Sequence, residues 1–307
     1  MTEQQWVEIP VFIHGITTAR QPGSHEKQYG ELRHIIDQAL MKHGKRPFAE
    51  ASIEVEWGWG LYEYREDEFN MHRYLATAQR LLGEQVSGAS RGRRDITLSP
   101  TRKAHQIVRE ILIRGFSDIF YYVSNDGETS IREDIFNELC YKINERDKEH
   151  KAVSLTIFAH SAGTIIAHDL LYHLFREKEG EDVEMMSIVR RLVKQGRVRI
   201  RRFYTMGSPL IPLAFRADSL LAKIMKGEKL HPETLGLRQK DGLSNPRWVN
   251  FWDQDDIISY PLAFLYETVD SEPVVEDRYI DIGDIFPGVH EKYWNSRKLA
   301  DYVAQTF

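Results

Sequence analysis

The chain contains a single cysteine, Cys140, among its 307 residues. One cysteine excludes intramolecular disulfides and is typical of a reducing compartment, so we expect a cytoplasmic protein in which Cys140 packs as a small apolar residue. The twelve histidines include no His-Glu-x-x-His motif and have no second cysteine to pair with. We therefore expect neither a metal site nor a cofactor.

Long apolar runs and an excess of positive charge are also lacking. No segment approaches the roughly 18 apolar residues of a membrane-spanning helix, and Met1–Gln5 is polar rather than the start of an export signal. We therefore expect no stable membrane insertion. The 41 Lys and Arg residues against 46 Asp and Glu give a net charge of −5, which disfavours a nucleic-acid partner because phosphates require a basic face. Oligomeric state is not readable from these features.

The most informative segment runs from Leu155 to Ala167. An apolar, β-prone run ends in Ala159-His160-Ser161-Ala162-Gly163, and a helix-prone run follows at once. A sharp strand-to-helix turn needs small residues two positions before and after its tip, and Ala159 and Gly163 meet that need. The pattern predicts a nucleophilic serine at the tip, whereas the alternative is a buried serine in an ordinary turn. The Ala162 N–H would then open the helix and point at a developing oxyanion.

A second segment near the N-terminus predicts the other half of an oxyanion hole. Trp6–Ile13 resembles a buried strand that runs into His14-Gly15-Ile16. Serine hydrolases of this kind take a second backbone donor from the loop after an early strand, and the Ile16 N–H is our candidate. Gly15 allows the loop to turn away without a Cβ clash. The side chain of His14 is expected to support the loop, because it precedes both the serine and any acid.

Candidates for the acid and the base follow the serine in the chain. A short strand over Trp248–Trp252 precedes three short carboxylates, Asp253, Asp255 and Asp256. We favour Asp256 because the β-branched pair Ile257-Ile258 follows it, and Asp253 and Asp255 remain alternatives. A strand is expected over Arg278–Ile282, and His290 follows it in a turn-rich stretch before a final helix. The order Ser, Asp, His belongs to one of the three convergent triad architectures.

The chain therefore resembles the α/β-hydrolase superfamily, in particular its lipase and esterase branch. The resemblance depends on His14-Gly15, Ala159-His160-Ser161-Ala162-Gly163, Thr205-Met206-Gly207-Ser208-Pro209, Asp256-Ile257-Ile258, and His290 before Tyr293-Trp294. These motifs span Val11 to Trp294, and they depart from the commonest pattern at Ala159, where glycine is usual. The resemblance implies an α/β fold, with a mostly parallel central sheet flanked by helices and with cap or lid insertions.

The resemblance further implies one α/β-hydrolase domain over residues 1–307. Helical periodicity predicts helices over Tyr29–His43 and Ser130–Ile143, and alternation predicts a strand near Ser52–Trp57. Residues 61–115 match nothing in the pattern and are interpreted as an inserted helical cap. Residues 210–245 form a lid-like excursion after Gly-Ser-Pro, and the substrate-binding candidates are His14, Gly15, Ile211, Leu213 and Phe215. The arginines at positions 190, 191, 197, 199, 201 and 202 are expected to be a solvated face rather than a phosphate site.

These features favour a carboxylic ester hydrolase that forms an acyl-enzyme on Ser161. Asp256 and His290 would complete the triad, and the N–H groups of Ile16 and Ala162 would hold the oxyanion. The partner would be a small-molecule ester with a short to medium acyl chain, since a charged, polar chain without an export signal fits dissolved substrates. An acyltransferase or thioesterase with the same triad, or a true lipase, remains an alternative. A non-catalytic binding module is the least favoured interpretation.

Overall fold

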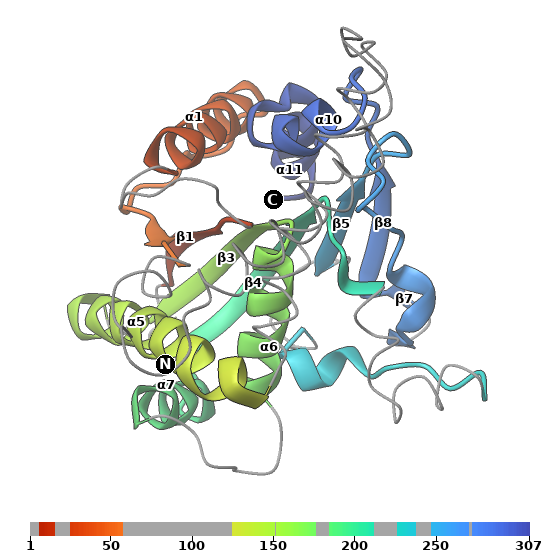
Figure 1. Ribbon diagram of the computed structural model, residues 1–307. Coiled ribbons are helices and arrows are strands. Elements are labelled where there is room, and N and C mark those ends of the chain that lie inside the picture. Colours follow the sequence, from red (N-terminus) through yellow and green to blue (C-terminus); the bar gives the residue numbers. More distant parts are fainter. Residues whose placement is uncertain are drawn as a thin grey trace, which may run out of the picture.

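The fold is built on a six-stranded sheet in which all strands are parallel (Figure 1). The computed structural model describes residues 6–15, 25–57, 125–150, 152–175, 184–211, 226–237, 247–269 and 272–307. The strand order is β2-β1-β3-β4-β5-β8. The strands are β1 (Val7–Ile13), β2 (Ile53–Val55), β3 (Val153–His160), β4 (Val198–Met206), β5 (Trp248–Trp252) and β8 (Val275–Tyr279). A short antiparallel pair, β6 (Thr268–Val269) and β7 (Glu272–Pro273), stands apart from the sheet.

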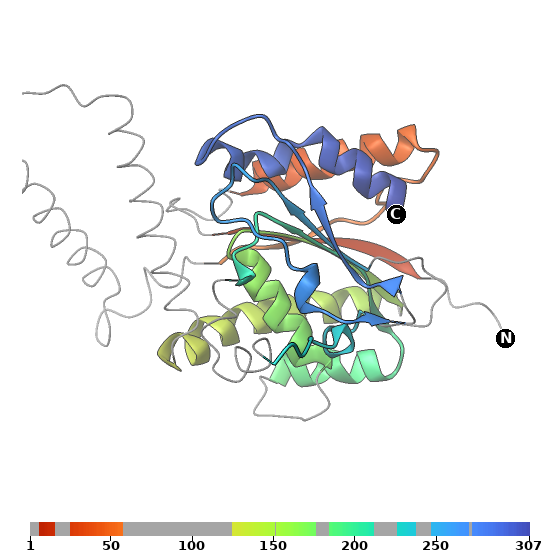
Figure 2. The same ribbon diagram turned by 90° about the vertical axis from the view of Figure 1, so that its right-hand side faces the viewer.

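Helices cover both faces of the sheet, which gives three layers (Figure 2). One face carries α1 (Glu26–Lys42) and α11 (Arg297–Thr306), which contact each other. The other face carries α5 (Asn125–His150), α6 (Gly163–Phe175) and α7 (Glu184–Lys194). The short elements are α10 (Gly288–Glu291), η1 (Pro232–Leu235), η2 (Ala263–Leu265) and η3 (Lys292–Asn295). The expected α/β fold with a parallel sheet flanked by helices is therefore confirmed.

Alternation along the strands divides the core between the two faces. In β1, Ile9, Val11 and Ile13 join the apolar cluster that includes residues of α5, α6 and α7. Phe12 joins the opposite cluster, with Phe158 of β3 and residues of α1 and α11. Because successive side chains of a strand point to opposite faces, a sheet buried on both sides needs apolar residues at nearly every position. In β3 every residue is buried, and five of the eight are apolar.

The loops after β1 and β3 lie at a point where the chain reverses its order across the sheet. From β1 the chain moves to β2 on one side, and it then returns to β3 on the other side of β1. The helix that follows β1 lies on the face of α11, whereas α6 follows β3 on the opposite face. The chain therefore leaves the carboxyl ends of the neighbouring strands β1 and β3 toward opposite faces of the sheet. In open α/β sheets, ligands bind at such switch points, outside the carboxyl ends of the strands.

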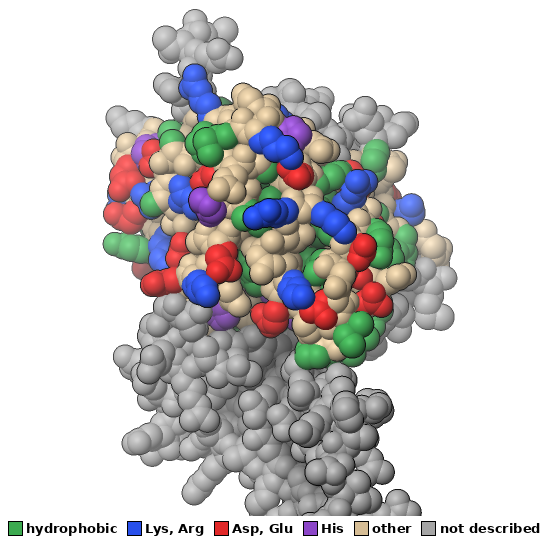
Figure 3. Space-filling model, turned by 90° about the horizontal axis from the view of Figure 1, so that it is seen from above, with side chains coloured by type: hydrophobic (Ala, Val, Ile, Leu, Met, Phe, Trp, Pro, Cys, Tyr) green, Lys and Arg blue, Asp and Glu red, His purple; other side chains and the backbone are tan. Residues whose placement is uncertain are grey.

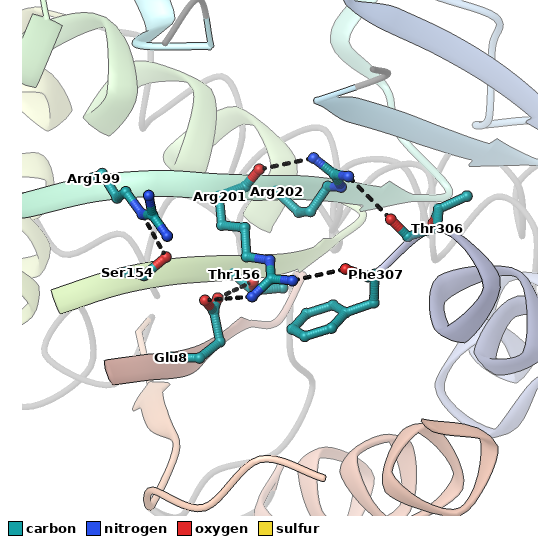
Figure 4. A network of polar contacts seen from close by, with 8 residues as sticks. All are labelled: Glu8, Ser154, Thr156, Arg199, Arg201, Arg202, Thr306 and Phe307. Carbon is teal, nitrogen blue, oxygen red and sulfur yellow. Dashed lines mark hydrogen bonds and ion pairs between the residues drawn. The ribbon is translucent and has the colours of Figure 1, made fainter. Parts of the chain in front are cut away.

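Arg201 and Arg202 of β4 are packed against other residues, which corrects the expectation of a solvated face at these two positions (Figure 4). Arg201 pairs with Glu8 at 3.2 Å and donates to the Phe307 carbonyl, and Arg202, 1% exposed, donates to the Thr306 carbonyl. The register shifts between Leu155 and Thr156, so that β4 holds an extra residue there. A β-bulge of this kind lets two consecutive side chains serve one face, and both arginines reach the end of α11.

Most elements expected from the sequence occur near their predicted bounds, with one strand displaced. The predicted helices correspond to α1 and to the longer α5, and Cys140 is buried in α5. The last strand of the sheet begins at Val275 rather than Arg278, because it pairs in parallel with β5 in the register Trp248 to Val275. The proposed cap at 61–115 lies outside the described residues, as do most of 210–245 and the side chains of Leu213 and Phe215.

The described surface mixes charges of both signs. Figure 3, seen from the side of α1 and α11, shows Lys and Arg side chains interspersed with Asp and Glu rather than gathered by sign. Many of these charges pair, such as Lys42 with Asp301 at 3.2 Å. Within the ranges that the structure describes, no helix has the length and apolar character needed to cross a membrane.

Candidate active site

Ser161 occupies a strained turn between β3 and α6. Its φ of 53° places it in the left-handed region, and it is the one non-glycine residue with positive φ in the described part of the chain. A non-glycine residue in this region costs on the order of 1–3 kcal/mol and persists only where surrounding contacts impose it. Its N–H donates to the Met206 carbonyl at 2.9 Å. The elbow predicted from the sequence is thus present as a backbone geometry.

Two glycines bring the loop after β1 into contact with this turn. A Cβ added to Gly15 would lie 2.5 Å from Ser161 Cβ and 3.0 Å from Ser161 Oγ. A Cβ added to Gly163 would lie 2.3 Å from the His14 carbonyl oxygen and 2.6 Å from that of Ile13. Any larger residue at either position would force these backbones apart. The structure therefore brings the predicted oxyanion loop directly against the predicted nucleophile.

The Ala162 N–H directly follows the serine in the chain and donates to no described acceptor. Ala162 is 2% exposed, and its N–H has no acceptor among the described residues, since the turn bonds run from Thr164 and Ile165 to Ser161 and Ala162. The first N–H groups of a helix have no partner within the helix and carry its positive dipole end. This N–H can therefore receive a negatively charged oxygen. The second predicted donor, Ile16, lies outside the described residues.

His14 is fixed beneath the loop by hydrogen bonds at both ring nitrogens and at its backbone N–H and carbonyl. The Trp57 N–H donates to His14 Nε2 at 3.2 Å, so Nδ1 carries the proton and donates to the Gly15 carbonyl. The backbone of His14 donates to Tyr29 Oη and accepts from Trp57 Nε1. Burial, with a smaller effect of His25, lowers the pKa of His14 from 6.5 to about 3. His14 is therefore a neutral support and not a proton acceptor at neutral pH.

His290 and Asp256 form a buried pair. Asp256 follows β5 and His290 lies in α10, and the Nδ1 of His290 is 2.9 Å from Asp256 Oδ2. The other oxygen of Asp256 accepts from the Ile258 N–H at 3.2 Å. An ionised carboxylate only accepts hydrogen bonds, so the proton lies on Nδ1 and the lone pair of Nε2 is exposed to an incoming proton. No described residue bonds His290 Nε2, which leaves it available to a hydroxyl.

Gly207 places this pair close to the serine. It has a φ of 59°, and a Cβ there would lie 3.0 Å from His290 Nδ1 and 3.1 Å from Asp256 Oδ2. The preceding residue, Met206, accepts the hydrogen bond from the Ser161 N–H. Consecutive residues after β4 therefore lie against the two parts of the site: Met206 bonds the Ser161 turn, and Gly207 lies against the His290–Asp256 pair. Gly207 has a signal in the sequence, the Gly-Ser-Pro that follows a buried strand, although sequence reasoning assigned it no role.

Neither of the two alternative acids bonds His290 in the described contacts. Asp253 is buried, and its carboxylate oxygens accept from the Asp255 N–H at 3.0 Å and from the Ile282 N–H at 2.8 Å. These bonds hold the loop after β5 to the loop after β8. Asp255 is exposed. Of the three carboxylates, the described contacts bring Asp256 alone to His290.

His160 supports the histidine of the pair from the other side of the turn. Its Nε2 lies 2.7 Å from the His290 carbonyl oxygen, so this nitrogen carries the proton and donates. Burial, together with the nearby His290, lowers the pKa of His160 well below 6.5. A neutral His160 thus fixes the backbone of α10 through a single bond. These contacts give His160 a structural position beside the pair.

The remaining substrate-binding candidates are only partly placed. Ile211 is half-buried and packs against the larger apolar cluster, while Leu213 and Phe215 lie outside the described residues. Sequence reasoning missed Tyr29, which bonds both His14 and the Val55 carbonyl beneath the loop. No local pattern marks it, since it appears as one apolar position of an amphipathic helix.

In the ranges described, no group of three or more His, Cys, Asp or Glu side chains is placed to hold a metal ion.

Comparisons with known proteins do not assign this chain to a family. No protein-family model and no curated protein matches the chain.

Proposed function

We propose that this protein is a serine hydrolase that cleaves carboxylic esters through an acyl-enzyme on Ser161. The observation that carries the proposal is the 2.9 Å bond between His290 and Asp256, formed by residues far apart in the chain and placed by Gly207 next to the Ser161 turn. A nucleophile, a base and a group that orients the base are the three parts that such catalysis requires. The order Ser, Asp, His supports the α/β-hydrolase interpretation, with which the parallel sheet flanked by helices is compatible.

Acylation begins when Ser161 Oγ attacks the ester carbonyl carbon and its proton moves to His290 Nε2. Asp256 accepts the Nδ1–H throughout, which holds the imidazole in the required tautomer and stabilises the imidazolium. The carbonyl oxygen becomes an oxyanion that the Ala162 N–H receives; a donor of this kind contributes about 3–4 kcal/mol in comparable sites. The second donor in the proposal is the Ile16 N–H.

The tetrahedral intermediate then loses its alcohol. The bond between the carbonyl carbon and the alcohol oxygen breaks, and the alcohol oxygen takes the proton from His290 Nε2. Water repeats the sequence on the acyl-enzyme: it transfers a proton to His290, attacks the acyl carbon, and releases the carboxylic acid as Ser161 recovers its proton. His14 takes no part in these transfers, because its pKa is near 3 and both of its ring nitrogens are bonded.

A panel of p-nitrophenyl esters with acyl chains from acetate to laurate tests the proposal. We expect hydrolysis with the highest kcat/KM at short to medium chains and no jump in rate above the solubility limit. Ser161→Ala should abolish the activity. Ser208→Ala is a matched control, because Ser208 is also buried nearby but bonds Thr164 Oγ1 at 2.9 Å.

The possible results separate the alternatives. A steep rise in rate beyond the solubility limit would mean a true lipase. Equal loss in Ser208→Ala and Ser161→Ala would show that the assay detects damage to the fold and not loss of a nucleophile. Full activity in Ser161→Ala would contradict the proposed function.

A further inference from the structure

A row of polar side chains crosses three neighbouring strands of the sheet, β4, β5 and β8 (Figure 1). Thr205 of β4 lies in register with Asn250 of β5, and Asn250 lies in register with Asp277 of β8. The side chains of Thr205 and Asn250 are fully buried. A sheet covered on both faces favours apolar residues at such positions, and a buried polar side chain normally persists only with its hydrogen-bonding groups satisfied.

The direction of the hydrogen bonds along this row is fixed by chemistry. The indole nitrogen of Trp248, which can only donate, donates to Thr205 Oγ1 at 2.9 Å. The Thr205 hydroxyl therefore donates its own proton to Asn250 Oδ1 at 2.8 Å. This leaves the amide nitrogen of Asn250 with two N–H donors. One donates to Asp277 Oδ1 at 2.8 Å, and the other donates to the Tyr260 carbonyl at 2.9 Å.

The row ends on the loop that follows β5. Besides Asn250, the carboxylate of Asp277 accepts from the Leu262 N–H at 2.7 Å and from the Ala263 N–H at 2.8 Å. Three hydrogen bonds thus attach residues 260–263 to the side chains of two strands. The bond from Asn250 to the Tyr260 carbonyl is the one nearest in sequence to the proposed acid.

The segment between β5 and this attachment is tied together internally. The Asp256 N–H donates to the Asp253 carbonyl at 3.1 Å, and the Ser259 N–H donates to the Asp256 carbonyl at 3.0 Å. Two consecutive turns of this kind make the segment a compact unit. A shift of Tyr260, the residue after Ser259, is therefore passed on to Asp256 and to its 2.9 Å bond with His290.

We propose that Asn250 is a positioning residue: by donating to the Tyr260 carbonyl, it holds the loop after β5 where Asp256 reaches His290. This inference rests on the proposed function, in which Asp256 orients the base. A small misplacement of a catalytic group can lower the rate by up to about 100-fold. Because Asn250 is fully buried beneath the loop, its loss should lower kcat and leave KM unchanged.

The test replaces the two donors of Asn250 with acceptors. Asn250→Asp keeps the size of the side chain but turns oxygen atoms toward the Tyr260 carbonyl and the Asp277 carboxylate. With p-nitrophenyl butyrate, we expect kcat to fall about ten- to 100-fold at an unchanged KM. Proton NMR gives a second measurement: the far-downfield resonance of the proton between His290 Nδ1 and Asp256, identified by its loss in Asp256→Asn, should shift or disappear.

Two further variants control for damage to the fold. Asp147 is also buried, and it pairs with Arg197 at 2.5 Å next to the amino end of β4, at the opposite end of the sheet from the site. Asp147→Asn should lower the free energy of unfolding and leave both kcat and the resonance unchanged. Asn250→Leu removes the two donors without adding a charge, and it takes the place of Asn250→Asp if that variant does not fold.

The outcomes distinguish the inference from the proposed function. A resonance unchanged from wild type in a folded variant at Asn250 would overturn the inference, whatever the rate. An equal fall of kcat in Asp147→Asn would also overturn it, because the loss would then follow stability rather than the loop. If the wild-type protein hydrolyses no ester, the proposed function fails, and the resonance still decides whether Asn250 holds Asp256 against His290.

Discussion

Replacing Gly163 with alanine should separate the two halves of the proposed oxyanion hole. The added methyl would lie 2.3 Å from the His14 carbonyl oxygen and 2.6 Å from that of Ile13. Both obstacles are backbone atoms, so no side-chain rotation relieves the overlap. The loop must withdraw by roughly 1 Å to reach an ordinary contact distance of about 3.5 Å.

The expected effects follow from that displacement. A misplacement of about 1 Å in a catalytic group can lower the rate by about 100-fold. Overpacking a tight contact costs about 1–3 kcal/mol, which exceeds the roughly 0.5–1 kcal/mol that alanine gains over glycine in a helix. We therefore expect Gly163→Ala to remain folded, with a somewhat lower free energy of unfolding and about 100-fold lower kcat/KM.

Gly30 provides the matched control. It lies within α1, and a Cβ there would meet no atom within 4 Å. Gly30→Ala should raise the free energy of unfolding by about 0.5–1 kcal/mol and leave ester hydrolysis unchanged. Urea unfolding and p-nitrophenyl butyrate hydrolysis measure both quantities for both variants. Wild-type kcat/KM in Gly163→Ala would refute the reasoning that this contact positions the site.

Two further changes test other parts of the account. Asp256→Asn should lower kcat for p-nitrophenyl butyrate by roughly four decades, because the imidazole loses the required tautomer. Asp253→Asn should mainly lower the free energy of unfolding. A larger loss of kcat in Asp253→Asn than in Asp256→Asn would identify Asp253 as the acid. Burial raises the pKa of Glu8 above 4.5 despite Arg201, so its contribution to stability is present below about pH 4.5 and is lost as pH rises through the folded-state pKa. In urea unfolding, wild type should therefore lose stability relative to Glu8→Gln as pH rises from 4 to 7, and a pH-independent difference would show that Glu8 titrates normally.

The turn at Ser161 and the strand before it were predictable from the sequence, because short local patterns determine both. Small residues around Ser161 impose a turn, and a buried run before them imposes the strand. The choice of Asp256 over Asp253 depended on a neighbouring β-branched pair, a preference without a geometric reason. The structure supplies that reason: Asp253 is occupied by the Ile282 N–H, so it holds two loops together.

The parts that sequence reasoning missed depend on contacts between distant segments. Arg202 has the character of a surface residue by type, yet a bulge in β4 turns it toward the end of α11, where it is buried. Tyr29 and His25 occupy positions at or near the start of an ordinary amphipathic helix, and only the tertiary fold brings them beneath the loop after β1. The periodicity of residues within a single helix or strand does not indicate which distant segments will contact it.

Labelling with a fluorophosphonate probe tests the central claim most directly, because only an activated serine reacts quickly with such a reagent. Peptide mapping should locate the label on Ser161 alone, and labelling should be lost in Ser161→Ala and strongly slowed in Asp256→Asn. Ser208→Ala should be labelled like the wild type. Labelling at another residue, or none in folded wild-type protein, would contradict the account.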